Sequence, residues 1–240
     1  QPGLHVVEDW PLADLLEVID WTPFFQSWEL AGRYPQILDD AVVGEQARSL
    51  YADARAMLAR IVEEKWLTAR AVFGLWPAQS HGDDVQLRTG QGDVTLHFLR
   101  QQVDKPAERP NLCLADFIAP AGSGKADWMG AFAVTAGIGI DAHVARFEAE
   151  HDDYNAILLK ALADRLAEAL TERLHQRVRT DYWGYAEDEA LDNAALIAER
   201  YRGIRPAPGY PACPEHSEKT SLFDLLDAPA NASMTLTESF

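Results

Sequence analysis

Cysteine is scarce in this sequence of 240 residues, since only Cys113 and Cys213 occur. Two cysteines are too few for a disulfide framework and are typical of a protein from a reducing compartment, so we expect a cytoplasmic location. No stretch approaches the ~18 uninterrupted apolar residues that a membrane span needs, and the first residues lack the basic and apolar regions of a signal peptide. The sequence therefore predicts neither membrane insertion nor secretion.

Positive charge is also in short supply. Lysine and arginine total 21 against 38 aspartates and glutamates, so the formal net charge at pH 7 is −17. A field of this sign repels polyanions, and nucleic acid is excluded as an expected partner.

What the sequence does contain is enough apolar material for a core, with 48% hydrophobic residues and seven tryptophans. No linker or internal repeat divides the chain, and we predict one domain over residues 1–240. A segment with helical periodicity comes first, strand-like segments follow, and helical periodicity returns in the last part of the sequence. Blocks in this order predict an α+β fold with a small, largely antiparallel sheet flanked by helices.

The periodicity of apolar residues places the expected elements. Residues 35–65 are expected to be largely helical, and a stripe at every fourth position from Tyr154 to Val178 predicts a long helix. Shorter helices are expected at 193–201 and 221–226. Strand-like runs are found in four places: residues 71–76, 94–98, 112–119 and 128–135.

Two motifs resemble sites without completing them. Gly137-Ile-Gly-Ile-Asp141 follows a strand-like run as a nucleotide loop would, but it lacks a third glycine, and a plain strand-to-helix turn with Asp141 as helix N-cap is the favoured interpretation. Asp141-Ala-His143 begins the Asp-x-His-x-x-Gly pattern of cobalt ligation, yet Arg146 replaces the glycine.

Metal ligation has weak support. Cys213 and His216 lie close in sequence, but a structural zinc site needs four ligands and no second pair has suitable spacing. The run His151-Asp-Asp153 cannot place all three side chains on one helix face. We therefore assign no metal ligands.

The segment Arg205-Pro-Ala-Pro-Gly-Tyr-Pro-Ala-Cys-Pro-Glu-His216 has the most distinctive chemistry. Its four prolines each fix φ near −65° and remove a backbone donor, so the loop loses little conformational freedom when a ligand binds. Arg205 offers a planar fork suited to a carboxylate. On these features alone, a rigid surface turn and a binding loop both remain open.

The beginning of this segment resembles the Arg-Pro-Ala-Pro-Gly-Tyr-Pro motif of the activation domain of cobalamin-dependent methionine synthase. Other stretches resemble that family in the same order along nearly the whole chain: Asp20-Trp-Thr-Pro-Phe-Phe25, Ala31-Gly-Arg-Tyr-Pro35, Leu99-Arg-Gln-Gln102, Leu112-Cys-Leu-Ala-Asp-Phe117, Ser123-Gly-Lys-Ala-Asp127, His151-Asp-Asp-Tyr-Asn155, Lys160-Ala-Leu-Ala-Asp-Arg-Leu-Ala-Glu168, Tyr182-Trp-Gly-Tyr185 and Leu236-Thr-Glu-Ser-Phe240.

The resemblance implies a C-shaped α+β domain that binds S-adenosylmethionine and reactivates the synthase after its cobalt has been oxidised to cob(II)alamin. The cobalamin would be held mainly by a partner domain. An electron from flavodoxin or a diflavin reductase would be coupled to methylation by S-adenosylmethionine.

The resemblance also implies site residues. Arg205 would pair with the ligand carboxylate, Asp20 with its ammonium, and the backbone at Ala207 would approach the adenine. The other matching positions would line the site or face the cobalamin: Tyr210, Glu168 and His216. Without the resemblance, Asp20 could cap a helix beginning at residue 22, Glu168 could lie on a solvated helix face, and Tyr210 and His216 could brace the loop.

One departure from the family pattern concerns the end of the sequence. Family domains continue beyond Leu236-Thr-Glu-Ser-Phe240 into a segment that helps to enclose the ligand, and this sequence stops there. It also lacks the cysteines that would hold zinc for homocysteine, so the chain is not expected to make methionine alone. The alternatives are a docking module without complete chemistry and, with least support, an independent methyltransferase.

Overall fold

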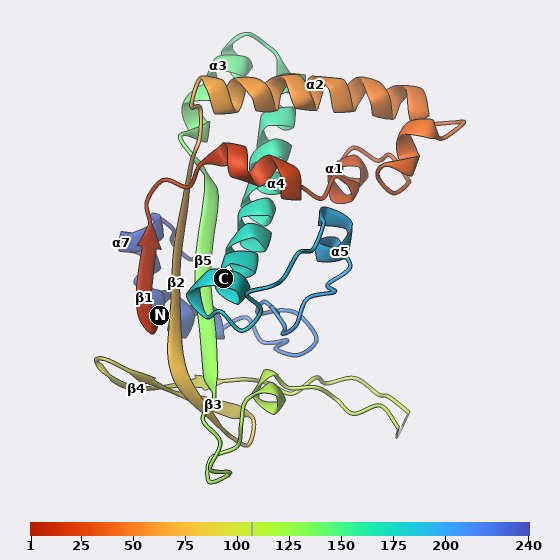
Figure 1. The fold of residues 1–240 in the computed structure, drawn as a ribbon. Coiled ribbons are helices and arrows are strands. Elements are labelled where there is room, and N and C mark those ends of the chain that lie inside the picture. Colours follow the sequence, from red (N-terminus) through yellow and green to blue (C-terminus); the bar gives the residue numbers. More distant parts are fainter. Residues whose placement is uncertain (107) are drawn as a thin grey trace. The chain divides into compact units, whose positions relative to one another are not determined.

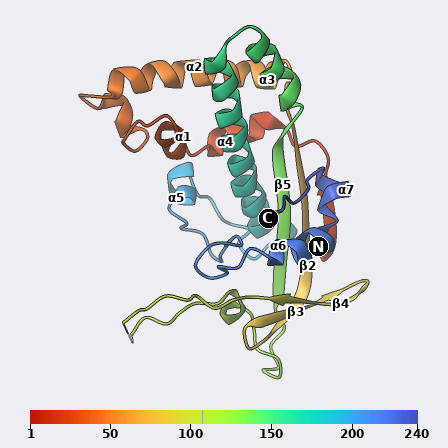
Figure 2. The ribbon, with the colours of Figure 1, turned by 180° about the vertical axis from the view of Figure 1, so that it is seen from behind.

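The computed structural model describes residues 1–106 and 108–240. Helices and strands alternate in blocks along the chain (Figures 1 and 2). The chain folds into two compact units, each assembled from separate stretches of sequence. The sheet unit comprises Gln1–Glu8, Ala71–Ala133 and Gly203–Phe240, and the helical unit comprises Asp9–Arg70 and Val134–Arg202.

The sheet contains β1 (Gly3–Val7), β2 (Thr68–His81), β3 (Asp84–Thr89), β4 (Gly92–His97) and β5 (Trp128–Ile138). The strand order is β1-β2-β3-β4, and β5 pairs with β2. The β1–β2, β2–β3 and β3–β4 ladders are all antiparallel, which confirms the predicted fold class. The long strands β2 and β5 begin in one unit and end in the other.

Side chains of the hairpin β3–β4 alternate between two environments. Val85, Leu87 and Leu96 are fully buried in the core of the sheet unit. The residues between them, among them Gln86 and Arg88, face away from that core because successive side chains of a strand point to opposite faces. The hairpin therefore has one apolar face and one polar face.

The expected strand at 112–119 is wrong, because this segment forms the 3₁₀ helix η3 (Leu114–Phe117). The Asp116 carboxylate accepts a hydrogen bond from the backbone N–H of Cys113 at 2.9 Å and also pairs with Arg100 at 2.6 Å. A side chain that binds the backbone three residues earlier favours a helical turn over an extended ladder. The helices α6 (Glu218–Leu226) and α7 (Ala228–Ala232) complete the sheet unit.

The helical unit contains η1 (Leu12–Val18), α1 (Thr22–Ser27), η2 (Gln36–Asp39), α2 (Gly44–Glu63), α3 (Ile140–Ala149), α4 (Asp153–Arg177), η4 (Val178–Tyr182) and α5 (Asn193–Ile197). The helix predicted within residues 35–65 is confirmed as α2, which buries Leu50, Ala54, Leu58 and Ile61.

The long helix predicted from the apolar stripe is confirmed as α4. Its leucines at every fourth position are buried from Leu158 to Leu174, whereas Tyr154 at the start of the stripe is 40% exposed. Asp152 caps the helix by accepting a hydrogen bond from the N–H of Asn155. Over the described part of the chain, no helix combines the length and the apolar character that a bilayer crossing requires.

The turn before α3 differs from the expectation in one detail. The N-cap of α3 is Gly139, with φ of +99°, and Asp141 lies inside the first turn. A Cβ atom at position 139 would lie 2.9 Å from the carbonyl oxygen of Trp66. Glycine is needed there because the backbone is left-handed and passes close to another segment, so the glycines serve the strand-to-helix turn.

Candidate functional site

The six residues expected at the site belong to both units. Asp20 and Glu168 belong to the helical unit, on the segment before α1 and on α4. The others lie in the loop of the sheet unit that precedes α6: Arg205, Ala207, Tyr210 and His216.

The proline-rich loop is held by its own backbone hydrogen bonds. The N–H of Gly209 donates to the carbonyl of Cys213 at 2.8 Å, and the N–H of Tyr210 donates to the carbonyl of Ala207 at 3.0 Å. The Cys213 thiol, which is buried, lies 3.0 Å from that same Ala207 carbonyl. Leu114 donates its N–H to the Ala212 carbonyl at 2.7 Å and ties the loop to η3. These hydrogen bonds restrain the loop in addition to its prolines, which supports the prediction of a rigid loop.

Burial raises the pKa of the Cys213 thiol, and the neighbouring Cys113 thiol contributes to the same shift. Burial likewise raises the pKa of Cys113. Both groups therefore remain thiols at neutral pH, and Cys213 acts as a hydrogen-bond donor to the loop. In the part of the chain that the structure describes, no cluster of three or more His, Cys, Asp or Glu side chains is arranged to hold a metal ion.

His216 packs against the turn at Gly209. The backbone of Gly209 is left-handed, with φ of +100°, and a Cβ atom added there would lie 2.4 Å from Cε1 of the His216 ring. Nδ1 of the ring lies 3.0 Å from the Lys219 ammonium, which donates to it. Gly209 and His216 thus form one contact that shapes the exposed tip of the loop. Tyr210 projects from this tip and is 62% exposed.

Asp20 lies directly before α1 and is half-buried. Its Oδ1 accepts a hydrogen bond from the N–H of Thr22 at 2.9 Å, although Trp21 is the formal N-cap residue. Among the described residues, no group donates to the second carboxylate oxygen of Asp20. Asp20 therefore supports the start of α1 with one oxygen and keeps the other available.

Glu168 lies on the exposed side of α4, between the buried residues Leu166 and Leu170. Within the described residues, the Glu168 carboxylate makes no hydrogen bond or ion pair. An exposed, unengaged carboxylate on a rigid helix suits both a solvated surface and a contact to a partner.

A buried ion pair close to the end of α4 was not anticipated from the sequence. Arg179 is fully buried and donates to both carboxylate oxygens of Glu189, at 2.7 Å and 2.6 Å. Its Nη1 lies 2.8 Å from Nδ1 of His175, and the guanidinium stacks 4.1 Å from the centre of the Tyr201 ring. This network holds the irregular segment after α4. Its only signal in the sequence is an arginine in a helical pattern, which usually lies on the surface.

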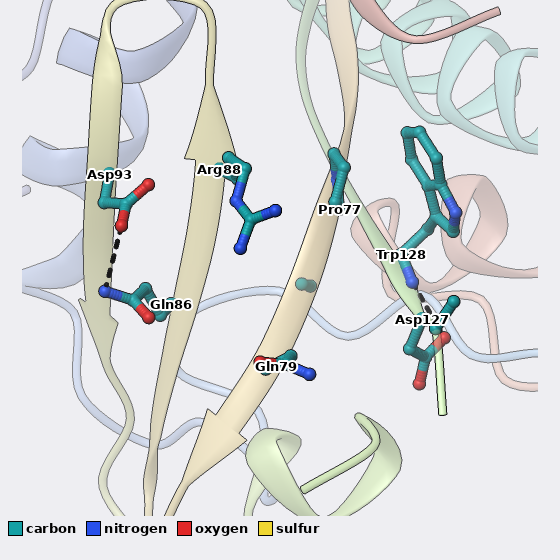
Figure 3. A pocket seen from close by; sticks show the side chains of 9 residues that line it. Pro77, Gln79, Gln86, Arg88, Asp93, Asp127 and Trp128 are labelled. Carbon is teal, nitrogen blue, oxygen red and sulfur yellow. Dashed lines mark hydrogen bonds between the residues drawn. The ribbon is translucent and has the colours of Figure 1, made fainter. Parts of the chain in front are cut away.

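The described residues also include a pocket of about 350 Å³ in the sheet unit (Figure 3). It lies on the polar face of the sheet, and none of the six expected site residues lines it. The polar and ring-bearing side chains that line it come from β2, β3, β4, the first residue of β5 and the residue before it: Pro77, Gln79, Gln86, Arg88, Asp93, Asp127 and Trp128.

Residues 11–240 match the model of a protein family described as "Vitamin B12 dependent methionine synthase, activation domain". The chain is also similar to a solved structure titled "Crystal Structure of the MetH Reactivation Domain bound to AdoHcy". The two share 53% sequence identity and superpose with a TM-score of 0.94, over 100% of this chain and 74% of the other.

Proposed function

Since the chain belongs to the family of activation domains of vitamin B12-dependent methionine synthase, we propose that it binds S-adenosylmethionine and supports reductive methylation of cob(II)alamin. The observation that supports this most is the similarity, across the whole chain, to a reactivation domain whose structure contains AdoHcy. AdoHcy is what S-adenosylmethionine becomes when it loses its methyl group. A fold that accommodates the product therefore suits the methyl donor.

The proposed ligand contacts follow from the chemistry of the six residues. The guanidinium of Arg205 would bind the carboxylate of S-adenosylmethionine, and the free Oδ2 of Asp20 would accept a hydrogen bond from its ammonium. The loop around Ala207 would present its backbone to the adenine. Because that loop is held by its own hydrogen bonds, binding orders few additional groups.

Cobalamin carried by a partner domain would supply the nucleophile for the methyl group, after reduction by flavodoxin or a diflavin reductase. The part proposed for this chain is to orient the sulfonium methyl and to limit access of water. Tyr210, exposed at the tip of the loop, and Glu168, exposed on α4, have the accessibility that a contact with the cobalamin domain requires. His216 would support the Tyr210 turn through its contact with Gly209.

Two measurements test this proposal. Calorimetric titration of the chain with S-adenosylmethionine should show saturable binding. Addition of a cob(II)alamin-loaded cobalamin domain, a reductant and S-adenosylmethionine labelled in the methyl group should transfer the label to cobalamin. A full-length synthase serves as the positive control. Binding to the cobalamin domain without binding of S-adenosylmethionine would replace the proposal with a docking role, and methyl transfer to an acceptor without cobalamin would indicate an independent methyltransferase.

A further inference from the structure

The pocket on the polar face of the sheet has a hydrogen-bonding imbalance among its lining groups. Its carboxylates are already engaged. Asp127 accepts hydrogen bonds from the N–H groups of Ala119 and Trp128, both at 2.8 Å, and Asp93 accepts from the side-chain amide of Gln86 at 3.3 Å. Both oxygens of Asp127 and one oxygen of the exposed Asp93 therefore already accept hydrogen bonds within the protein.

Three other donors of the pocket have no such partners among the described residues. Arg88 is directly opposite Asp93 in the β3–β4 ladder, yet no ion pair or hydrogen bond involves its guanidinium in the described part of the chain. Figure 3 shows this side chain leaving β3 on the side of β2, whereas Asp93 lies on β4 and bonds to Gln86. The Gln79 amide and the Trp128 indole N–H are likewise without a protein partner among the described residues.

Apolar surface borders these donors. The N–H of Ala78 donates to the carbonyl of Asp127 at 2.9 Å, which brings the Pro77 segment of β2 next to the start of β5 at Trp128. Pro77 and Trp128 are both half-buried and both line the pocket. A ligand with a flat or aliphatic body can therefore contact ring surfaces while its polar end meets Arg88.

From this combination we propose that the pocket binds a small organic carboxylate. The carboxylate lies on the Arg88 guanidinium, which suits it in shape and charge, and the apolar body lies against Pro77 and Trp128. A pocket of about 350 Å³ is at the lower end of the size range for small-molecule sites, roughly 300–1,000 Å³, which favours a compact ligand. Such a site is separate in sequence from the six residues assigned to S-adenosylmethionine, and it does not depend on that assignment.

Benzoate is a suitable probe because it joins a carboxylate to a flat apolar ring. The chain, uniformly labelled with ¹⁵N, is titrated with benzoate to about 10 mM, a range that detects millimolar dissociation constants. The indole N–H resonance of Trp128, assigned by its loss in Trp128→Phe, reports on the pocket itself. We expect this resonance to shift saturably.

The variant Arg88→Gln keeps a polar side chain but removes the charge, and it should weaken benzoate binding at least about tenfold, since a charge-assisted pair is lost. Arg109→Gln is the matched control, because Arg109 is an exposed arginine of the same unit outside the pocket. It should bind benzoate as the unchanged chain does. Circular dichroism melting curves establish that both variants are folded.

Three ligands decide between this proposal and simpler ones. Benzamide has the shape of benzoate without the charge, and acetate and inorganic phosphate are anions without an apolar ring. All three should bind at least about tenfold more weakly than benzoate. Equal binding of benzamide would show an apolar site without carboxylate recognition, and equal binding of phosphate or acetate would show a general anion patch. Either result, or the absence of a saturable shift with benzoate, would overturn the proposal.

Discussion

Arg205 is half-buried at the start of the proline-rich loop, and the proposed function depends on it more than on any other side chain. Replacing it by alanine removes the partner of the ligand carboxylate. We expect Arg205→Ala to weaken S-adenosylmethionine binding by about 2 kcal/mol or more, which is roughly 30-fold. Titration calorimetry measures the change, and Arg109→Ala provides a charge-matched control. Unchanged affinity in Arg205→Ala would sink the assignment.

Gly209 is a second single residue on which the loop depends. In Gly209→Ala the alanine would have to keep the left-handed backbone of Gly209, which costs roughly 1–2 kcal/mol for a residue with a Cβ. Its Cβ would also meet the ring of His216. We expect a lower thermal midpoint together with weaker S-adenosylmethionine binding. Gly90→Ala is the control, because no atom lies within 4 Å of the position that its Cβ would take. Equal effects of the two substitutions on the thermal midpoint and on binding would show that the turn at position 209 does not require glycine.

At the scale of one element, η4 and the end of α4 are held by a buried charge. Removing Arg179 leaves the Glu189 carboxylate, whose side chain is 6% exposed, without its partner. We expect Arg179→Met to lower the free energy of unfolding by about 3–5 kcal/mol. Arg177 lies two residues before Arg179 and forms an exposed ion pair with Asp181, four residues further on. Arg177→Met breaks this pair and should lower the free energy of unfolding by only about 0–1 kcal/mol. Urea unfolding curves compare the two, and similar losses would argue against this account.

The junction of α2 and α3 should be sensitive to acid. His143 stacks on the buried ring of Trp66, with centroids 4.5 Å apart. Burial lowers the pKa of His143 and the nearby Arg146 lowers it further, with Arg60 acting in the same direction and Glu64 against it. The unfolded chain therefore takes up a proton at this residue at a higher pH than the folded chain does. The free energy of unfolding consequently falls as the pH drops below the ordinary histidine value of about 6.5.

A pair of histidine variants checks this dependence. The difference in thermal midpoint between pH 7.5 and pH 5.5 should shrink in His143→Gln. It should persist in His81→Gln, since His81 is exposed at the end of β2. An unchanged difference in His143→Gln would show that other groups carry the acid sensitivity.

At the scale of the whole molecule, the net charge of −17 opposes folding through self-repulsion. Raising the ionic strength from about 10 mM to about 150 mM shortens the Debye length from about 30 Å to about 8 Å. Because this screens the repulsion, we expect the free energy of unfolding to rise with added salt, and the thermal midpoint to rise by about 2–4 °C for each 1 kcal/mol of that increase. The double variant Glu63→Gln, Asp188→Asn removes two exposed negative charges, so its thermal midpoint should rise less when salt is added. A midpoint that falls with added salt would contradict this view.

Prediction from sequence succeeded where local rules decide the structure. The buried faces of α2 and α4 follow from apolar residues at helical spacing. It failed where distant partners decide. The strand β1 went unpredicted because its five residues pair with β2, which is distant in sequence, and η3 was misassigned because its turn depends on Asp116 and Arg100. The strand β3 was also missed, although its partners β2 and β4 are its neighbours in sequence.

The sequence by itself determined the family and the residues offered as a site, because runs of motif in a fixed order carry that information without any coordinates. Only the tertiary structure decided which side chains have partners. It buried Arg179 against Glu189, and within the described residues it left Arg88 without a protein partner opposite Asp93, which accepts a hydrogen bond from Gln86 instead. The physical reason is that burial and hydrogen bonding depend on segments distant in sequence, so residues of the same type acquire opposite roles.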